Sequence, residues 1–352
     1  MGLIWNGPAD ASATPFVCYS YDEFVSQFAA TGFDVNAGLS VMLRNQVSDF
    51  YSVAGKGAEL WIMVDSANGV FTIDKGLALL KAAEGRINVL GIFALGGLDN
   101  NLSNLINTAN ACAQQAADLH MPIRALIDGA NYSGNAVNAL NLKTGSWNRV
   151  GVCISSIRAD NHAALGLLLG MIASIPVNRN IGRIKNGVAA TTVYLTSGTL
   201  LNSSTPNLEL LHDKGYIFLR KVPTKAGYFW NDDHMACSDT DDYYSLSNGR
   251  VIDKVARIAH STYLNELLDE VIVDQATGRI IPTMMKYYQT EIEQAVNLGM
   301  KAEGEVSGVQ ANVDPNQDVL ATSKLVVELQ VTPTGTNRSI LVKLGLFNPA
   351  NA

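Results

Sequence analysis

The sequence predicts an α/β fold for the N-terminal part, which forms a doubly wound βαβ layer. Because the C-terminal part adds helices and antiparallel strands, the chain as a whole is α+β. Four apolar runs recur at intervals of roughly thirty residues, as βαβ units require. Uninterrupted apolar runs are typical of parallel strands that are buried on both faces. The C-terminal part shows a hairpin, two long helices and terminal antiparallel strands. The four runs are 60–64, 87–93, 123–127 and 150–155.

Helical patterns fill the intervals between these runs and also precede the first of them. Gly55 and Gly57 end the helix that comes before the first run. An uncharged apolar stretch at 163–177 is too short to span a bilayer and is interpreted as a buried helix. The remaining predicted elements are a strand at 16–19 and helices at 21–28, 39–51, 74–83, 101–119 and 130–140.

The C-terminal part begins with a predicted hairpin over 215–230, whose turn contains Pro223 and Gly227. Two amphipathic helices follow, the first from Ser245 to about 273 and the second at 284–298. Two alternating segments, 324–332 and 339–347, predict terminal strands. The predicted organisation is therefore an α/β domain at 1–177, a connecting segment at 178–205 and a C-terminal domain at 206–352.

Composition excludes several classes of function. Of the 352 residues, 47% are hydrophobic and 16% are charged, which indicates a folded chain with much buried or subunit-covered surface. The net charge of −7 disfavours nucleic-acid binding, which depends on basic patches. No basic or apolar signal region opens the chain. Reduced, buried thiols in an intracellular compartment are expected for Cys18, Cys112, Cys153 and Cys237, which form no C-x-x-C pair.

No residue pattern indicates catalysis or a cofactor. Gly96 and Gly97, like Asp128, follow predicted strands where a ligand would bind, but no phosphate-binding motif surrounds them. His120, His162 and His260 lack a neighbouring nucleophile signature. An acidic loop offers oxygen ligands at spacings typical of no known metal motif, so a solvated turn is the favoured interpretation. Its candidate ligands are Asp232, Asp233, His234, Asp239, Asp241 and Asp242.

The order of these motifs resembles that of contractile tail sheath proteins, the family found in phages, R-type bacteriocins and related injection systems. The segment 16–28, Phe-Val-Cys-Tyr-Ser-Tyr-Asp-Glu-Phe-Val-Ser-Gln-Phe, is similar to the family's opening strand and first helix. No single motif is specific, but their order across nearly the whole chain is. The other segments that carry the resemblance are 47–64, 78–94, 208–230, 250–258 and 314–347.

The resemblance implies a structural, non-enzymatic protein without cofactors. Sheath subunits stack as hexameric rings around an inner tube, exchange terminal strands with neighbours, and contract by rigid-body rearrangement. The expected partners are copies of the chain, the tail tube protein, the baseplate and the tail terminator, with neither nucleic acid nor membrane insertion. The expected location is a virion tail assembled in the host cytoplasm. Family members usually have a longer arm before the strand at 16–19, so this chain has either a short arm or a trimmed start.

Two site hypotheses follow from the resemblance and the spacing. Arg250, Lys254 and Arg257 share one helical face, apart from the apolar core face, and we expect this basic stripe to face the inner tube, with an exposed solubilising face as the alternative. The alternatives to a sheath subunit are a terminator or baseplate protein with the sheath fold, and a soluble α/β ligand-binding protein or enzyme. The strand expected to pair with an adjacent subunit contains Ile340, Leu341, Val342, Lys343, Leu344, Leu346 and Phe347.

Overall fold

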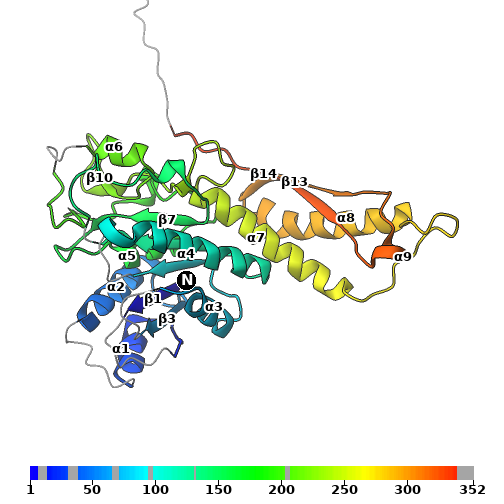
Figure 1. Cartoon of the computed structure of the whole chain (residues 1–352), viewed down its shortest axis with the longest axis horizontal. Helices are drawn as coiled ribbons and strands as arrows, with labels where there is room; N and C mark the ends of the chain where they lie inside the picture. Colours follow the sequence, from blue (N-terminus) through cyan, green and yellow to red (C-terminus); the bar gives the residue numbers. More distant parts are fainter. Residues whose placement is uncertain are drawn as a thin grey trace, which may run out of the picture.

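A six-stranded sheet with helices on both faces forms one half of the protein (Figure 1). The computed structural model describes residues 1–6, 14–30, 39–65, 71–93, 98–130, 132–202 and 207–338. Neighbouring strands of the sheet are parallel except at one edge, where β2 runs antiparallel to β3. In spatial order the strands are β2 (Phe16–Cys18), β3 (Leu60–Asp65), β1 (Gly2–Asn6), β4 (Val89–Ile92), β5 (Arg124–Asp128) and β7 (Val150–Cys153).

The first residues of the chain form β1, near the middle of the sheet. Leu3 and Ile4 are buried, and Leu3 pairs in register with Ile62 of β3 on one side and Gly91 of β4 on the other. No strand was predicted before the one at 16–19, so this prediction was wrong. A run of five residues at the start of the chain is too short to show a hydrophobic period, so the sequence did not reveal it as a strand. Its apolar residues are nevertheless typical of a strand inside a sheet that is buried on both faces.

Two helical layers cover the sheet, as the doubly wound prediction requires. On one face α2 (Leu39–Ala54) packs against α5 (Leu165–Ser174), and α5 contacts β4 and β5. On the other, α3 (Ile73–Ala82) packs against α4 (Leu98–Asp118), which contacts β5 and β7. The short helix α1 (Tyr21–Ala30) contacts β2 and α2. The predicted α/β layer is confirmed.

The helices α2 and α5 approach each other at backbone distance. A Cβ atom added at Gly166 would lie 1.9 Å from the carbonyl oxygen of Gln46, and one at Gly170 would lie 2.6 Å from that of Phe50. The Gln46 side chain bridges the helices, because its Oε1 accepts from the Gly166 N–H at 2.7 Å and its Nε2 donates to the Ala163 carbonyl at 3.0 Å. Only glycine fits at these two positions of α5.

The predicted hairpin is confirmed as β10 (Leu219–Lys221) paired with β11 (Tyr228–Trp230). It lies against the sheet, since Ile217 bridges to Cys153 and Trp230 belongs to the main hydrophobic core. The segment that the sequence analysis assigned to the C-terminal domain thus begins inside the α/β core. The small elements around it are β6 (Ser146–Trp147), β8 (Ser155–Ser156), β9 (Tyr194–Leu195), α6 (Leu208–Asp213) and β12 (Ala236–Cys237).

The rest of the chain forms an arm that projects from the α/β layer (Figure 1). The long helices α7 (Leu246–Tyr263) and α8 (Pro282–Val296) pack side by side, and the antiparallel pair β13–β14 covers them. Val251, Ile292 and Val306 belong to a second, smaller core there. The remaining arm elements are a π-helical turn (Asn297–Lys301), β13 (Val306–Val313), α9 (Val319–Thr322) and β14 (Val327–Pro333).

Several predicted bounds differ from the structure. The first arm helix ends at Tyr263 rather than near 273, and a short 3-10 turn, Leu264–Glu266, follows it. Residues 132–140 form turns instead of the predicted helix. The strand β13 was not predicted, because its glycine interrupts the alternation, whereas β14 matches the segment at 324–332. The segment at 339–347 lies outside the described residues.

All four cysteines are free and buried, which agrees with the expectation of buried thiols. Burial raises the pKa of Cys18 to about 11 and that of Cys112 to about 12, so these thiols stay protonated at neutral pH. Across the described part of the chain, none of the helices combines the length and the apolarity that a membrane crossing needs.

We expect Gly166→Ala to destabilise the protein by roughly 1–3 kcal/mol or more, because the added methyl group overlaps the Gln46 carbonyl. Gly308→Ala is the matched control, since nothing lies within 4 Å of its Cβ position. Urea unfolding of both variants measures the difference. Equal midpoints for the two variants would show that α2 and α5 can separate at little cost.

Candidate functional site

The helix α7 joins the arm to the α/β layer, and its N-cap is Ser245, where the sequence predicted the start of this helix. The Ser245 hydroxyl accepts from the Asn248 N–H at 3.2 Å, which is an N-cap interaction. The buried carboxylate of Asp233 accepts from the Ser247 N–H at 2.8 Å. These two side chains satisfy N–H groups in the first turn of the helix.

Arg250 points from α7 into the end of α5. Its guanidinium donates to the carbonyls of Ile172 at 3.1 Å, Ile175 at 3.3 Å and Pro176 at 3.4 Å. The last carbonyls of a helix lack intrahelical partners and carry the negative end of its dipole, so a cation is favourable there. Burial lowers the pKa of Arg250 to about 10, against the raising effect of Asp233 and Glu305, and the group remains charged.

The other two predicted cations of α7 also have partners inside the subunit. The Lys254 ammonium forms an ion pair with the buried carboxylate of Glu305. Arg257 donates to the carbonyls of Gly85, Ile87 and Pro122, at the edge where β4 and β5 begin. Burial lowers the pKa of Arg257.

The sequence analysis placed these three cations on one face away from the core, and the structure differs. Arg250 is 9% exposed, and the side chain of Lys254 is 35% exposed. The three cations lie along α7 at the predicted spacing. The helix is covered on more than one side, however, because the arm and the α/β layer both pack on it. Their role toward a tube stays a prediction.

A buried ion cluster that the sequence analysis missed fixes the same helix. Asp253 of α7 accepts from Arg124 of β5 at 2.7 and 2.9 Å and from Arg149 at 3.2 Å. Arg124 is 1% exposed, and it also donates to the carbonyls of Asn148 and Gly249. The sequence did carry a signal for this cluster, since Arg124 is a charged residue at the start of an otherwise apolar strand. A buried charge requires a partner of opposite charge, so an internal ion pair could have been predicted.

The acidic loop binds side chains of this chain. Arg338 lies 3.1 Å from the Asp232 carboxylate and 3.3 Å from that of Asp233, and its guanidinium stacks on Tyr244 at 4.7 Å. Asn180 donates to both carboxylates at 2.6 Å. Asp232, Asp233 and Tyr244 thus hold Arg338, the last described residue of the chain, beside the first turn of α7.

The two carboxylates of this cluster have opposite pKa shifts. Burial raises the pKa of Asp233 to about 6, and the neighbouring charge of Asp232 adds to the effect. Burial also acts on Asp232, but the charge of Arg338 and hydrogen bonds from Asn180 and Arg338 outweigh it and bring its pKa to about 2. Asp232 is therefore the carboxylate that carries the charge opposite Arg338 across the acidic range.

The other candidate ligands are separated. His234 Nε2 lies 2.6 Å from Asp239, which also pairs with Lys143 at 2.9 Å, while Asp241 accepts from Asn148 at 3.1 Å. The Asp242 side chain takes part in none of these contacts within the described part of the chain. Within the residues that the structure describes, no three His, Cys, Asp or Glu side chains converge as a metal site.

Of the ligand positions that were considered at the strand ends, the structure describes Asp128. Asp128 is buried and accepts from the Ala163 N–H at 2.7 Å, and His162 Nδ1 lies 2.6 Å from it. This contact anchors the segment that enters α5. Gly96 and Gly97 lie outside the described residues. His120 and His260 stack on each other with ring centroids 4.1 Å apart.

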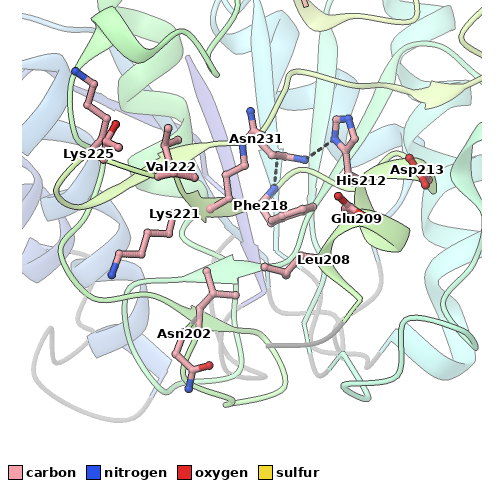
Figure 2. Close-up of a pocket in the computed structure, with 14 residues that line it drawn as sticks. Asn202, Leu208, Glu209, His212, Asp213, Phe218, Lys221, Val222, Lys225 and Asn231 are labelled. Atoms are coloured by element: carbon pink, nitrogen blue, oxygen red, sulfur yellow. Dashed lines mark hydrogen bonds between the residues drawn. The ribbon is translucent and has the colours of Figure 1, made fainter. Parts of the chain in front are cut away.

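A surface pocket of about 860 Å³ lies beside the hairpin (Figure 2). Asn231 donates to the Tyr216 carbonyl at 2.9 Å and accepts from the Phe218 N–H at 2.8 Å, and its amide nitrogen lies 3.3 Å from His212. Burial lowers the pKa of His212. The lining side chains carry both signs of charge and include Glu209, Asp213, Arg220, Lys221 and Lys225. This lining suits a surface contact and supplies no nucleophile activated by a base.

The β13–β14 pair is a small sheet whose two edges pair with no further strand in the described part of the chain. Among the described residues it has two strands only, so each strand carries a row of backbone groups that no third strand satisfies. Val327, Leu329 and Val331 of β14 pack half-buried on the arm core, and the residues between them point outward. Such an edge can accept a strand from another chain.

Comparison with known proteins gives family matches over most of the chain. Residues 27–234 match the model described as DUF2586, N-terminal domain, and residues 242–351 match the DUF2586, C-terminal domain. The division between the two models falls within the acidic loop, whereas the predicted C-terminal domain began at 206. No curated protein sequence matches the chain.

Solved structures of contractile sheaths have the same fold. The contracted helical sheath of the anti-feeding prophage has a TM-score of 0.65 at 13% identity, over 98% of this chain and 92% of that one. The contracted PVC sheath, from an extracellular contractile injection system, gives 0.64 at 14%, over 98% and 91%. A sheath tail protein from Desulfitobacterium hafniense gives 0.56 at 10%, over 95% and 96%. The resemblance predicted from the sequence is confirmed at the level of the fold.

We expect Asp253→Ala to destabilise the protein by about 3–5 kcal/mol, because it leaves Arg124 buried without a counter-charge. Asp22→Ala is the control. Its ion pair with Lys56 is exposed, with side-chain accessibilities of 83% and 84%, and pairs of this kind contribute ~0–1 kcal/mol. Thermal unfolding of both variants measures the difference, and similar melting temperatures would contradict a structural role for the cluster.

The raised pKa of Asp233 predicts a pH effect of defined sign. Because the folded state holds this proton more tightly than the unfolded state, its contribution is present below pH 3.8 and is lost as the pH rises through about 6. The stability of the wild type relative to Asp233→Asn should therefore fall between pH 4 and 7, by up to ~3 kcal/mol.

Denaturant unfolding at pH 4, 5, 6 and 7 measures this difference. Asp274→Asn is the control, because hydrogen bonds from Thr277 lower the pKa of Asp274 and place its titration below this window. A difference between the wild type and Asp233→Asn that stays constant with pH would contradict the raised pKa.

Proposed function

The chain belongs to the DUF2586 family, and we propose that it is a structural subunit of a contractile tail sheath. The observation that supports this most strongly is the match of nearly the whole chain, α/β layer and arm together, to sheath structures. In this proposal, subunits stack as hexameric rings around an inner tube and drive it through the target envelope when they contract. No step requires a cofactor or nucleotide.

We further propose that the terminal segment of each subunit adds a strand to a neighbour. Arg338 holds the start of this segment at Asp232 and Asp233, beside the base of the arm. An extended strand over 339–347 spans about 30 Å, which is enough to leave the parent subunit. The edges of β13–β14 are the acceptor that this proposal favours, because no third strand among the described residues pairs with them.

The partners in this proposal are other copies of the chain, the tail tube protein, the baseplate and the tail terminator. The assembly forms in the host bacterial cytoplasm and functions in the virion tail. Strand links of this kind hold neighbouring subunits while the subunits themselves rotate as rigid bodies.

We also keep the proposal that α7 faces the tube. Arg250 and Arg257 donate to internal carbonyls, so they set the position of the helix. The side chain of Lys254 is 35% exposed, and it supplies charge on that surface. The support for this proposal is the family likeness together with the spacing of the three cations.

Electron microscopy of the chain at high concentration tests the proposed function. We expect the wild type to form striated hollow cylinders and a deletion of 339–352 to leave short oligomers or monomers, because the strand link is lost. Closed single rings from the wild type would indicate a terminator or baseplate component. A wild type that remains monomeric would contradict the sheath proposal.

The double variant Lys254→Glu with Glu305→Lys tests the tube-facing role. The variant keeps an ion pair between positions 254 and 305 with the two charges exchanged, so folding should be retained. The accessible position 254 then carries a negative charge in place of a positive one. We expect weaker co-assembly with the tube protein and an altered dependence on salt, since partly exposed charges are screened. Co-assembly equal to that of the wild type at every salt concentration would rule out a contact at Lys254.

A further inference from the structure

The segment between α7 and α8 lies at the end of the arm (Figure 1). Several of its large apolar side chains are exposed. Leu268 is 98% exposed and has a left-handed backbone with φ of 69°, which is unusual for leucine. Leu264, Leu267 and Ile272 are 54%, 68% and 61% exposed. Exposed apolar side chains grouped in this way mark an interaction site.

The same segment, which we call the acidic loop of the arm (264–274), carries charge of one sign. No lysine or arginine lies between Arg257 and Arg279. None of its carboxylates forms a salt bridge with any other residue that the structure describes. The charged members are Glu266, Asp269, Glu270 and Asp274.

A surface of opposite charge lies at the other end of α7. A polar pocket of about 650 Å³ is lined by four arginines, against the carboxylates of Asp232 and Glu303. Asp232 is already paired with Arg338. The three other arginines are exposed and form no salt bridge within the described part of the chain. They are Arg179, Arg183 and Arg220, and we call them the basic pocket.

The sequence around the basic pocket has the opposite bias to the acidic loop of the arm. Between Asp160 and Glu209 there is no aspartate or glutamate, whereas this stretch contains Arg179, Arg183 and Lys185. The two surfaces are therefore complementary in charge, although the chain as a whole has a net charge of −7.

One copy of the chain cannot join these two surfaces. Asp232 lines the basic pocket, and the adjacent Asp233 binds the first turn of α7, while the acidic loop of the arm follows the last turn. A helix with the 18 residues of α7 is about 27 Å long, and its packing on the α/β layer keeps it in place. The partner of each surface is then a second molecule.

We propose that the acidic loop of the arm in one subunit docks in the basic pocket of a second copy. Glu266, Asp269 and Glu270 face Arg179, Arg183 and Arg220 of the neighbour, and the exposed leucines lose water at the same contact. Such a contact is heterologous, because different surfaces of the two copies meet, and repetition of it generates a ring or an open helix. The inference rests on the proposed sheath function and adds a specific lattice contact to it.

Two charge-reversed variants test the contact. The pocket variant is Arg179→Glu with Arg183→Glu, and the loop variant is Asp269→Lys with Glu270→Lys. These side chains are exposed and form no salt bridge within the described part of the chain, so both variants should fold. Each alone presents like charges at the contact, and we expect the concentration needed for assembly to rise about tenfold or more, as measured by sedimentation.

An equimolar mixture of the two variants gives the decisive result. The acidic pocket of one variant then meets the basic loop of the other, and the unchanged surfaces match as well, so assembly should return to near the wild-type concentration. The control Lys81→Glu with Lys286→Glu changes the net charge by the same amount as the pocket variant at exposed residues outside both surfaces. It should assemble like the wild type.

The remaining outcomes separate this inference from the proposed function. If the wild type and both variants assemble equally well, the contact is wrong and the sheath function stands. If the pocket variant fails but the loop variant assembles normally, the basic pocket binds a different acidic surface and the loop is excluded. If the wild type does not assemble, the proposed function and the contact both fail.

Discussion

The carboxylate of Asp253 joins the two halves of this protein. It lies on α7, the helix that leads into the arm, and it binds Arg124 at the start of a central strand and Arg149 beside it. Arg124 is almost completely buried, so removal of its partner would leave a charge in a medium of low dielectric constant. The direction of the arm relative to the sheet follows from this cluster.

The same constraint determines what the other polar residues of α7 do. Arg250 donates hydrogen bonds to carbonyl groups at the end of α5, and Arg257 donates to carbonyl groups at the edge of the sheet. Lys254 forms an ion pair with Glu305 of the arm. A helix that contacts both halves keeps only part of its surface, including the Lys254 side chain, for an outside partner. The strand edges and the loop at the end of the arm are exposed as well, and assembly is proposed to depend on these parts too.

A subunit of this construction suits mechanical work. The α/β layer is closely packed, with helices that touch at backbone distance through Gly166 and Gly170, and such a body moves as a unit. The parts that are proposed to link copies lie at the periphery, where they can bend or re-pair while the core stays intact. In the proposed contraction, energy comes from the difference between two arrangements of rigid subunits.

The sequence alone determined the elements whose signal is local. The regular recurrence of apolar runs predicted β3, β4, β5 and β7. The turn residues predicted the hairpin, and Ser245 marked the start of α7. Periodicity and caps depend on neighbours within a few residues, so one sequence is enough to read them.

Only the tertiary structure decided which distant segments meet. It placed the opening residues at the centre of the sheet, paired Arg124 with Asp253 across 129 positions, and turned a predicted surface stripe into internal contacts. It also showed that the hairpin shares the α/β core. Such pairings leave no periodic trace, because the partners are chosen by the packing of the whole chain.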